Sequence, residues 1–218
     1  KMPWWLIGTA FVATGVSTEG GGIFVSSGFS IRGTTKVTGQ GSGANIEGTV
    51  GNLNMIGSGF LSLGDGSNVT GKVRLASGVV NTQVIADGAI HGSLTVIGNV
   101  AHDTVHLRGP IDGRINLSLG EGINAVTSDE EFVASNGLIY RGGSGPDDVS
   151  LIANGDVLVP GVNGPIRLLL GDGSNTVTLG GQGLYAGSVQ VVGGAGSDAI
   201  TSASGIRLAG NLRANLGD

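Results

Sequence analysis

The sequence predicts an all-β fold, a parallel β-helix or β-solenoid of roughly nine coils of about 23 residues. Three observations predict it: a Gly-rich turn that recurs along the chain, short strands that alternate apolar and polar residues, and almost no helical periodicity. The composition agrees, because 44 of the 218 residues are Gly and 39% are hydrophobic. Since only 4% are aromatic, aliphatic side chains have to fill a long, thin core.

The recurring turns are Gly-rich and end in Asn or Asp. The copies are GSGAN (Gly41–Asn45), GDGSN (Gly64–Asn68), GEGIN (Gly120–Asn124), GDGSN (Gly171–Asn175) and GGAGSD (Gly193–Asp198), with a weaker copy, GNVAHD, that ends at Asp103. The end residues recur at one spacing in three pairs, which are Asn45 and Asn68, Asn124 and Asp147, and Asn175 and Asp198. A spacing of about 23 residues is typical of a solenoid repeat.

These turns are interpreted as corners of the coil. Gly adopts positive φ without steric cost, and Asn or Asp does so less readily. Stacked Asn side chains also hydrogen-bond along a stack of strands, as in cross-β ladders. The predicted structural turn residues are Asn45, Asn68, Asn124, Asn175, Gly64, Gly66, Gly171 and Gly173.

The strands between the turns are short. Triplets such as Leu61-Ser62-Leu63 and Leu117-Ser118-Leu119 place apolar residues inward and polar residues outward. Coils that stack at about 4.8 Å per layer would bury these residues in ladders. We expect Leu61, Leu117 and Leu168 to lie in register in one aliphatic ladder.

Two segments resemble a calcium-binding repeat. Gly142–Ser150 reads GGSGPDDVS and Gly193–Thr201 reads GGAGSDAIT, and both match the pattern GGxGxDxUx of the RTX nonapeptide family, which are secreted bacterial proteins. The resemblance implies a β-roll with Ca²⁺ at Asp147 and Asp198, and at Asp156, which lies one nonapeptide further on. In that family the nonapeptides run in tandem, whereas these two begin 51 residues apart. The alternative that no cofactor binds therefore stays open.

A second likeness covers Leu61 to Gly98. Its short apolar strands and Gly turns, such as VTGKV and AIHGSLTV, resemble the rungs of bactofilins, which are self-polymerising bacterial β-helix proteins. That resemblance implies a cytoplasmic location as an alternative to the bacterial cell surface or the extracellular space. An uncapped solenoid exposes strand edges at both ends, so the pattern also favours end-to-end association.

The domain organisation follows from the same patterns. We expect residues 1–18 to form a hydrophobic N-terminal cap or interface segment, and residues 19–218 to form a single β-solenoid that continues beyond the C-terminus, because Leu216-Gly217-Asp218 begins another LGDG turn. A cap, a strand donated to another subunit and a signal remnant are the alternatives for the N-terminal run, which is too short to predict a membrane span. The predicted interface residues are Trp4, Trp5, Leu6, Ile7, Phe11 and Leu216.

Other function classes have little support. The chain has no Cys, so a thiol nucleophile or thiolate metal site is excluded. His102 and His106 share a strand face but lie about 13 Å apart, too far to bind one zinc ion. A net charge of −5 and scattered Arg residues argue against a nucleic-acid partner. We predict no catalytic residues and no enzyme activity.

The predicted function is that of a structural, self-associating module in a bacterial fibre, surface layer or adhesin stalk. Its partner would be the protein itself, through an end-to-end or lateral homopolymer, or the rest of a larger chain. The alternative is a calcium-responsive RTX-type β-roll module of a secreted exoprotein, in which Ca²⁺ drives folding outside the cell.

Overall fold

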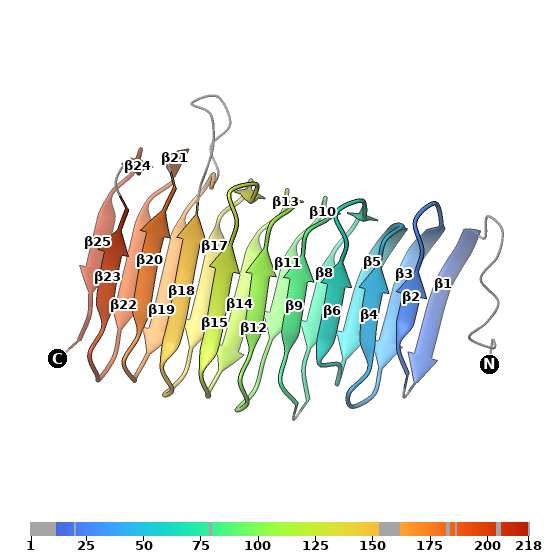
Figure 1. Ribbon diagram of the computed structural model, residues 1–218, viewed down its shortest axis with the longest axis horizontal. Coiled ribbons are helices and arrows are strands. Elements are labelled where there is room, and N and C mark those ends of the chain that lie inside the picture. The colour runs from blue at the N-terminus through green and yellow to red at the C-terminus, as the bar shows by residue number, and fades with distance from the viewer. Residues whose placement is uncertain are drawn as a thin grey trace.

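The described part of the chain forms a rod of stacked parallel strands (Figure 1). The computed structural model describes residues 12–19, 21–78, 80–152, 162–181, 184–185, 187–203 and 206–217. These residues form 25 strands and no helix, and they wind through about eight turns of about 21 residues. The first strand and the last lie at opposite ends of the rod (Figure 1). The predicted all-β solenoid is confirmed.

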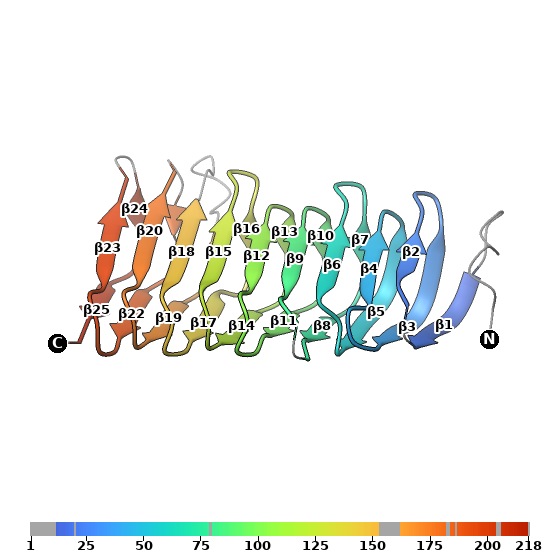
Figure 2. The same ribbon diagram turned by 60° about the horizontal axis from the view of Figure 1, so that its bottom comes forward.

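Each turn contributes strands to three faces, which we number in chain order and which Figure 2 shows from a second side. Face 1 is a nine-stranded sheet of β2 (Ile23–Val25), β4 (Gly43–Ile46), β6 (Phe60–Leu63), β9 (Gln83–Ala86), β12 (Thr104–Leu107), β15 (Asn124–Ser128), β18 (Asp147–Ile152), β20 (Thr176–Gly180) and β23 (Ala199–Ser202). Face 2 is short and contains β7 (Asn68–Val69), β10 (Ala89–Ile90), β13 (Pro110–Ile111) and β16 (Val133–Ala134), and the pair of β21 (Leu184–Tyr185) and β24 (Arg207–Leu208) follows at the same stage of later turns.

Face 3 completes each turn. Its strands are β8 (Val73–Ala76), β11 (Leu94–Ile97), β14 (Ile115–Gly120), β17 (Leu138–Gly142), β19 (Ile166–Gly171), β22 (Val189–Gly193) and β25 (Leu212–Asn215). Three longer strands, β1 (Val12–Glu19), β3 (Ser30–Thr38) and β5 (Thr49–Ile56), begin the stack. The first residues of β5 pair with β7 on face 2 and its last residues pair with β8 on face 3, so β5 runs across a corner.

The turns differ in length. On face 1, residues that pair between neighbouring strands form one column along the rod. The number of residues between two successive members of this column is small from Gly43 to Phe60, larger from Gln83 to Thr104 and largest from Asp148 to Thr176. The paired strands nevertheless keep their positions in the stack. The predicted period of about 23 residues is slightly longer than the observed average of about 21, and about eight turns are present where nine were predicted. No single spacing describes all the turns.

The core is a set of aliphatic columns, one residue per turn. Leu117 and Leu168 share a column of face 3, as predicted, with Tyr140 between them. Leu61 lies elsewhere, because its strand belongs to face 1 and it pairs with Val84. The prediction for Leu61 was wrong because two similar LSLG segments occupy different faces, and the sequence of one segment does not specify the face.

Some predicted residues lie outside the described ranges. They are Trp4, Trp5, Leu6, Ile7, Phe11 and Asp156. Leu216 is described, and it is half-buried and packs against the core. Of the predicted N-terminal segment, Val12 to Thr18 belong to β1, which pairs with β3. Within the described ranges, no helix is long and apolar enough for a membrane span.

Candidate functional site

A ladder of polar side chains runs inside the rod along the corner between face 3 and face 1. Its members stand at the start of successive face 1 strands, one per turn, and are Thr82, Asp103, Asn124, Asp147, Asn175 and Asp198. All except Asp198 are at most 3% exposed, and Asp198 is half-buried. Polar groups are buried at such positions only when hydrogen bonds compensate for the lost water.

Hydrogen bonds connect each rung of this polar ladder to the next. The Thr82 backbone N–H donates to Asp103 Oδ1 (2.7 Å). Asn124 Nδ2 donates to Asp147 Oδ1 (2.9 Å), and the Asp147 backbone N–H donates to Asn175 Oδ1 (2.9 Å). Asn175 Nδ2 in turn donates to Asp198 Oδ1 (2.8 Å). With the Asp103 backbone N–H donating to Asn124 Oδ1, the polar ladder is a continuous connection between turns that lie far apart in the sequence.

Aspartate and asparagine alternate along the polar ladder from Asp103 to Asp198. An amide therefore separates each carboxylate from the next, and no two carboxylates are neighbours. Since stacked turns are only about 4.8 Å apart, consecutive carboxylates would repel each other in a medium of low dielectric. The alternation provides N–H donors to the carboxylates and keeps like charges two turns, about 10 Å, apart.

The alternation extends to the residue five positions before each ladder residue. Gly98, Gly142 and Gly193 precede Asp103, Asp147 and Asp198, whereas the buried Leu119 and Leu170 precede Asn124 and Asn175. The Asn-bearing turns carry this Leu as one extra residue, since the register shifts between Ser118 and Gly120 and again between Leu169 and Gly171. Two types of turn therefore alternate, and we call them Gly–Asp turns and Leu–Asn turns.

Asp147 has the least favourable surroundings on the polar ladder. Among the described residues, its Oδ2 forms no well-aligned hydrogen bond. The buried hydroxyl of Tyr140 forms none either, but it lies close enough to this carboxyl to lower its pKa. Burial is the main cause of a raised pKa for the Asp147 carboxyl, and hydrogen bonds from neighbouring groups only partly oppose it. Burial, together with the charge of Asp147, also raises the pKa of Tyr140.

Asp147→Asn is expected to stabilise the fold at pH 7 by about 1 kcal/mol. The new amide is neutral, so the free-energy cost of burying the Asp147 charge is removed. Its Nδ2 would donate to a turn carbonyl, as Asn124 Nδ2 does to Gly120 O. Because the folded pKa of Asp147 is raised, its destabilising effect grows as pH rises from the ordinary Asp pKa through the raised value. Urea denaturation of both proteins at pH 4 and pH 7 measures the effect, which should be present at pH 7 and nearly absent at the lower pH.

The same pair of proteins tests calcium binding. If Asp147 ligated Ca²⁺, the Asn variant would be less stable than the wild type in calcium buffer, and EDTA would lower the melting temperature of the wild type. We expect EDTA to leave both melting temperatures unchanged. A loss of several degrees that calcium restores would contradict this expectation and favour the RTX-type alternative.

The structure brings four of the predicted residues together and separates the others. Asn124, Asn175, Asp147 and Asp198 all belong to the polar ladder, so the residues assigned to turns and those assigned to calcium form one feature. Asn45 instead pairs with Phe24 and Ser62 inside face 1.

The two GDGSN copies occupy different corners. Gly171 and Gly173 have φ of 78° and 98° as predicted, in the corner that leads to face 1. The copy from Gly64 to Asn68 instead connects face 1 to face 2, where Asn68 pairs with Thr49 and Ala89. Gly64 and Gly66 do not have positive φ, so that prediction was wrong for these two residues. The Ser67 N–H closes this corner by donating to Gly64 O at 2.8 Å, which shows a different turn with the same sequence.

The structure places the predicted calcium ligands Asp147 and Asp198 on the polar ladder, and calcium at them stays a prediction. The described residues contain no cluster of three or more His, Cys, Asp or Glu side chains that could hold an ion. Asp147 and Asp198 are two turns apart with Asn175 between them, and Oδ1 of each carboxylate accepts a hydrogen bond from an amide. Calcium prefers six to eight oxygen ligands around one ion, and this arrangement does not converge two carboxylates on a point.

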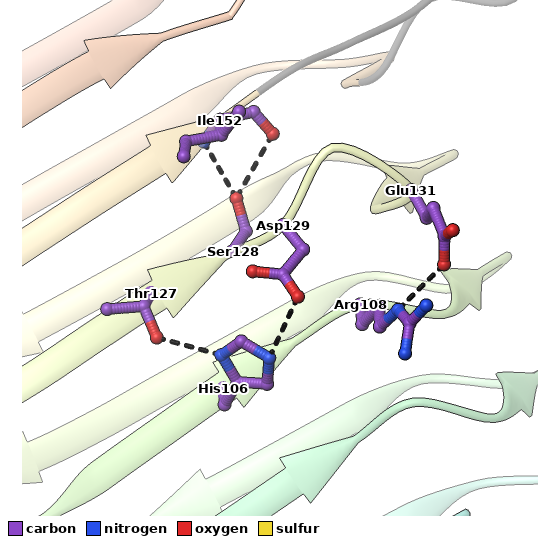
Figure 3. Close-up of polar contacts among 7 residues, drawn as sticks. All are labelled: His106, Arg108, Thr127, Ser128, Asp129, Glu131 and Ile152. Atoms are coloured by element: carbon purple, nitrogen blue, oxygen red, sulfur yellow. Dashed lines mark hydrogen bonds and ion pairs between the residues drawn. The ribbon is translucent and has the colours of Figure 1, made fainter. Parts of the chain in front are cut away.

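Outward side chains also connect neighbouring turns, on the solvent side of face 1 (Figure 3). His106 contacts the Thr127 hydroxyl through Nδ1 (3.0 Å) and the Asp129 carboxylate through Nε2 (3.3 Å). Arg108 Nε donates to Glu131 Oε2 at 2.7 Å, and Glu131 raises the Arg108 pKa. Exposed pairs of this kind contribute little stability each. Through these contacts, His106 and Arg108 connect neighbouring turns at the surface of the rod.

Comparisons with models of known families, with curated proteins and with solved structures found no match. The resemblances to RTX proteins and to bactofilins therefore stay predictions from the sequence, and the parallel β-solenoid architecture is what the structure establishes.

Proposed function

We propose that this protein is a structural module that associates end to end, as part of a bacterial fibre, surface layer or adhesin stalk outside the cell. Support comes first from the shape. The described residues form one stack of turns with a continuous core, and the rod keeps a similar cross-section along its length (Figure 2). A stack whose turns contact only their neighbours extends by adding further turns of the same kind.

The observation that carries the proposal is the exposure of Leu212. It stands in the column of face 3 that contains Ile166 and Val189, each only 1% exposed, and it pairs directly with Val189. Leu212 is nevertheless 48% exposed. Within the described residues no strand follows β25, so an inward-facing core residue is covered on one side only.

A second copy of the chain fits this end. At the opposite end of face 3, β1 has β3 as its one partner among the described strands. Because all these strands are parallel, β25 of one copy and β1 of the next would add to each other in the same direction. Such a contact joins two different surfaces, so repetition of it gives an open filament. The backbone groups of both strands that have no strand partner among the described residues would supply the hydrogen bonds.

Leu212→Lys is expected to weaken self-association at least tenfold, or by about 1.4 kcal/mol per contact, because a charge replaces a side chain whose burial is favourable. Sedimentation over a concentration series and electron microscopy of the purified protein measure the effect. The matched control is Val100→Lys, which adds the same charge at a corner in the middle of the rod, where Val100 is 74% exposed. Monomeric wild-type particles at high concentration would contradict the proposal, as would equal effects of the two variants.

A further inference from the structure

Face 3 presents two lanes of outward side chains that run along the rod. The register of its strands places Lys36, Arg74, Arg167 and Arg213 in one lane. The other positions of this lane are Asn54, Thr95, Asn116, Ile139 and Gln190. We call this the basic lane. The adjacent lane contains Ile56, Ala76, Ile97, Leu169 and Val192, with Thr38, Ser118, Arg141 and Asn215 at its other positions. We call it the apolar lane after its five apolar residues.

Most of the charge on this face is positive, although Glu19 ends β1, and Glu121 and Asp172 directly follow β14 and β19. The face 3 strands from β3 to β25 contain no Asp or Glu. They carry the four cations of the basic lane together with Arg32 and Arg141, while Lys72 and Arg114 directly precede β8 and β14, so eight of the eleven Lys and Arg residues lie on or beside this face. The net charge of −5 conceals this segregation. The prediction that the Arg residues are scattered was wrong for this face, because the unequal turn lengths hide their alignment.

The basic lane ends in a shallow groove of about 250 Å³. Arg167 and Arg213 line it, with Gln190 between them and with Ser188 and Asn211 at one side. Arg167 Nε donates to Gln190 Oε1 at 3.1 Å, which holds the guanidinium in place at the groove. Guanidinium groups held in this way bind carboxylates through paired hydrogen bonds. Arg167 and Arg213 are two turns, about 10 Å, apart along the rod.

We propose that face 3 binds a linear acidic polysaccharide that lies along the rod. Its carboxylates would meet the cations of the basic lane, with the strongest contacts in the groove at Arg167 and Arg213, and its hydroxyl groups would meet the amides of the same lane. The apolar lane would contact the C–H surfaces of the sugar rings.

Other polyanions fit this face less well. The outward positions of the two lanes hold no Phe, Tyr or Trp, so nothing stacks against the bases of single-stranded nucleic acid. A polysaccharide needs no such rings, because its carboxylates and hydroxyl groups pair with the cations and amides of the basic lane. An anionic membrane would use the same cations, and the test below separates it.

Binding of the intact protein to polygalacturonate, measured by calorimetry at several salt concentrations, tests the proposal. We expect the double variant Arg167→Gln/Arg213→Gln to bind at least tenfold more weakly, with a shallower dependence of log Kd on log salt by about 1 to 2. The matched control is Arg108→Gln, which removes a cation from face 1. Circular dichroism of each variant checks that the fold is retained.

Three further probes decide between sources of negative charge. Neutral dextran of the same length should not bind. Single-stranded DNA and vesicles of phosphatidylglycerol should bind more weakly than polygalacturonate. The proposal is overturned if polygalacturonate does not bind, if DNA or vesicles bind more tightly, or if Arg108→Gln weakens binding as much as the double variant.

Discussion

Asn124→Asp is expected to lower the free energy of unfolding by about 3 kcal/mol at pH 7. Asn124 donates through Nδ2 to Asp147 Oδ1 at 2.9 Å, and its Oδ1 accepts from the Asp103 backbone N–H at 3.3 Å. An aspartate here would place two buried carboxylate oxygens in contact and remove the donor that Asp147 uses. The substitution changes almost no volume, so the loss reports electrostatics and not packing.

The loss should shrink as the pH falls. Two carboxylates in contact share one proton, which raises the folded-state pKa of the pair above the unfolded value of about 3.9. The folded variant therefore binds more protons than the unfolded chain in that range, and its stability rises as pH falls toward 4. Urea denaturation at pH 4, 5.5 and 7 measures this recovery against the wild type.

Asn45→Asp is the matched control, because it makes the same change in a similar Gly-rich motif outside the polar ladder. Asn45 lies in β4 beside Phe24 and Ser62 and is half-buried, so we expect a change within about 0.5 kcal/mol at every pH. If both variants lose the same stability, or if the loss in Asn124→Asp does not depend on pH, the polar ladder does not have the electrostatic role assigned to it.

The sequence was sufficient for the architecture because that depends on local patterns. Alternating strands, Gly corners and repeated motifs each predict the same coil, so the all-β solenoid follows from them together. The nonapeptide pattern also identified Asp147 and Asp198, which do occupy equivalent positions, although as members of a hydrogen-bonded ladder. Asp103 was visible as the end of a weak copy of the turn motif.

The register of the turns could not be predicted from the same patterns. The identical GDGSN segments at Gly64 and Gly171 fold into different corners. The strands on either side, and not the sequence of the turn itself, determine which two faces a turn connects. The unequal turn lengths then shift every later residue, so the alignment of Arg74 with Arg167 has no signature in sequence spacing. One usable signal was missed: the residue five positions before each ladder residue is Gly before Asp and Leu before Asn.

Gly142→Ala is expected to lower the free energy of unfolding by about 3 kcal/mol, through overlap of the new methyl group with fixed atoms. A Cβ at this position would overlap Asp147 Oδ2 and the backbone carbonyl oxygen of Leu170. Gly142 does not have positive φ, so the cost is steric and not conformational. The Leu170 carbonyl belongs to the next turn, and it moves only if two turns separate. Thermal and urea denaturation measure the loss.

Two further variants identify the cause of this loss. Gly66→Ala is the control, because a Cβ there meets no atom within 4 Å, and we expect a change within about 0.5 kcal/mol. Combining Gly142→Ala with Asp147→Ala removes one of the two overlapping atoms, so the double variant should be about 1 kcal/mol more stable than the sum of the single losses predicts. Strict additivity would show that Gly142 and Asp147 do not compete for the same space. Coupling would instead explain why glycine precedes aspartate in each Gly–Asp turn: the carboxylate reaches its place on the polar ladder only where the facing residue has no side chain.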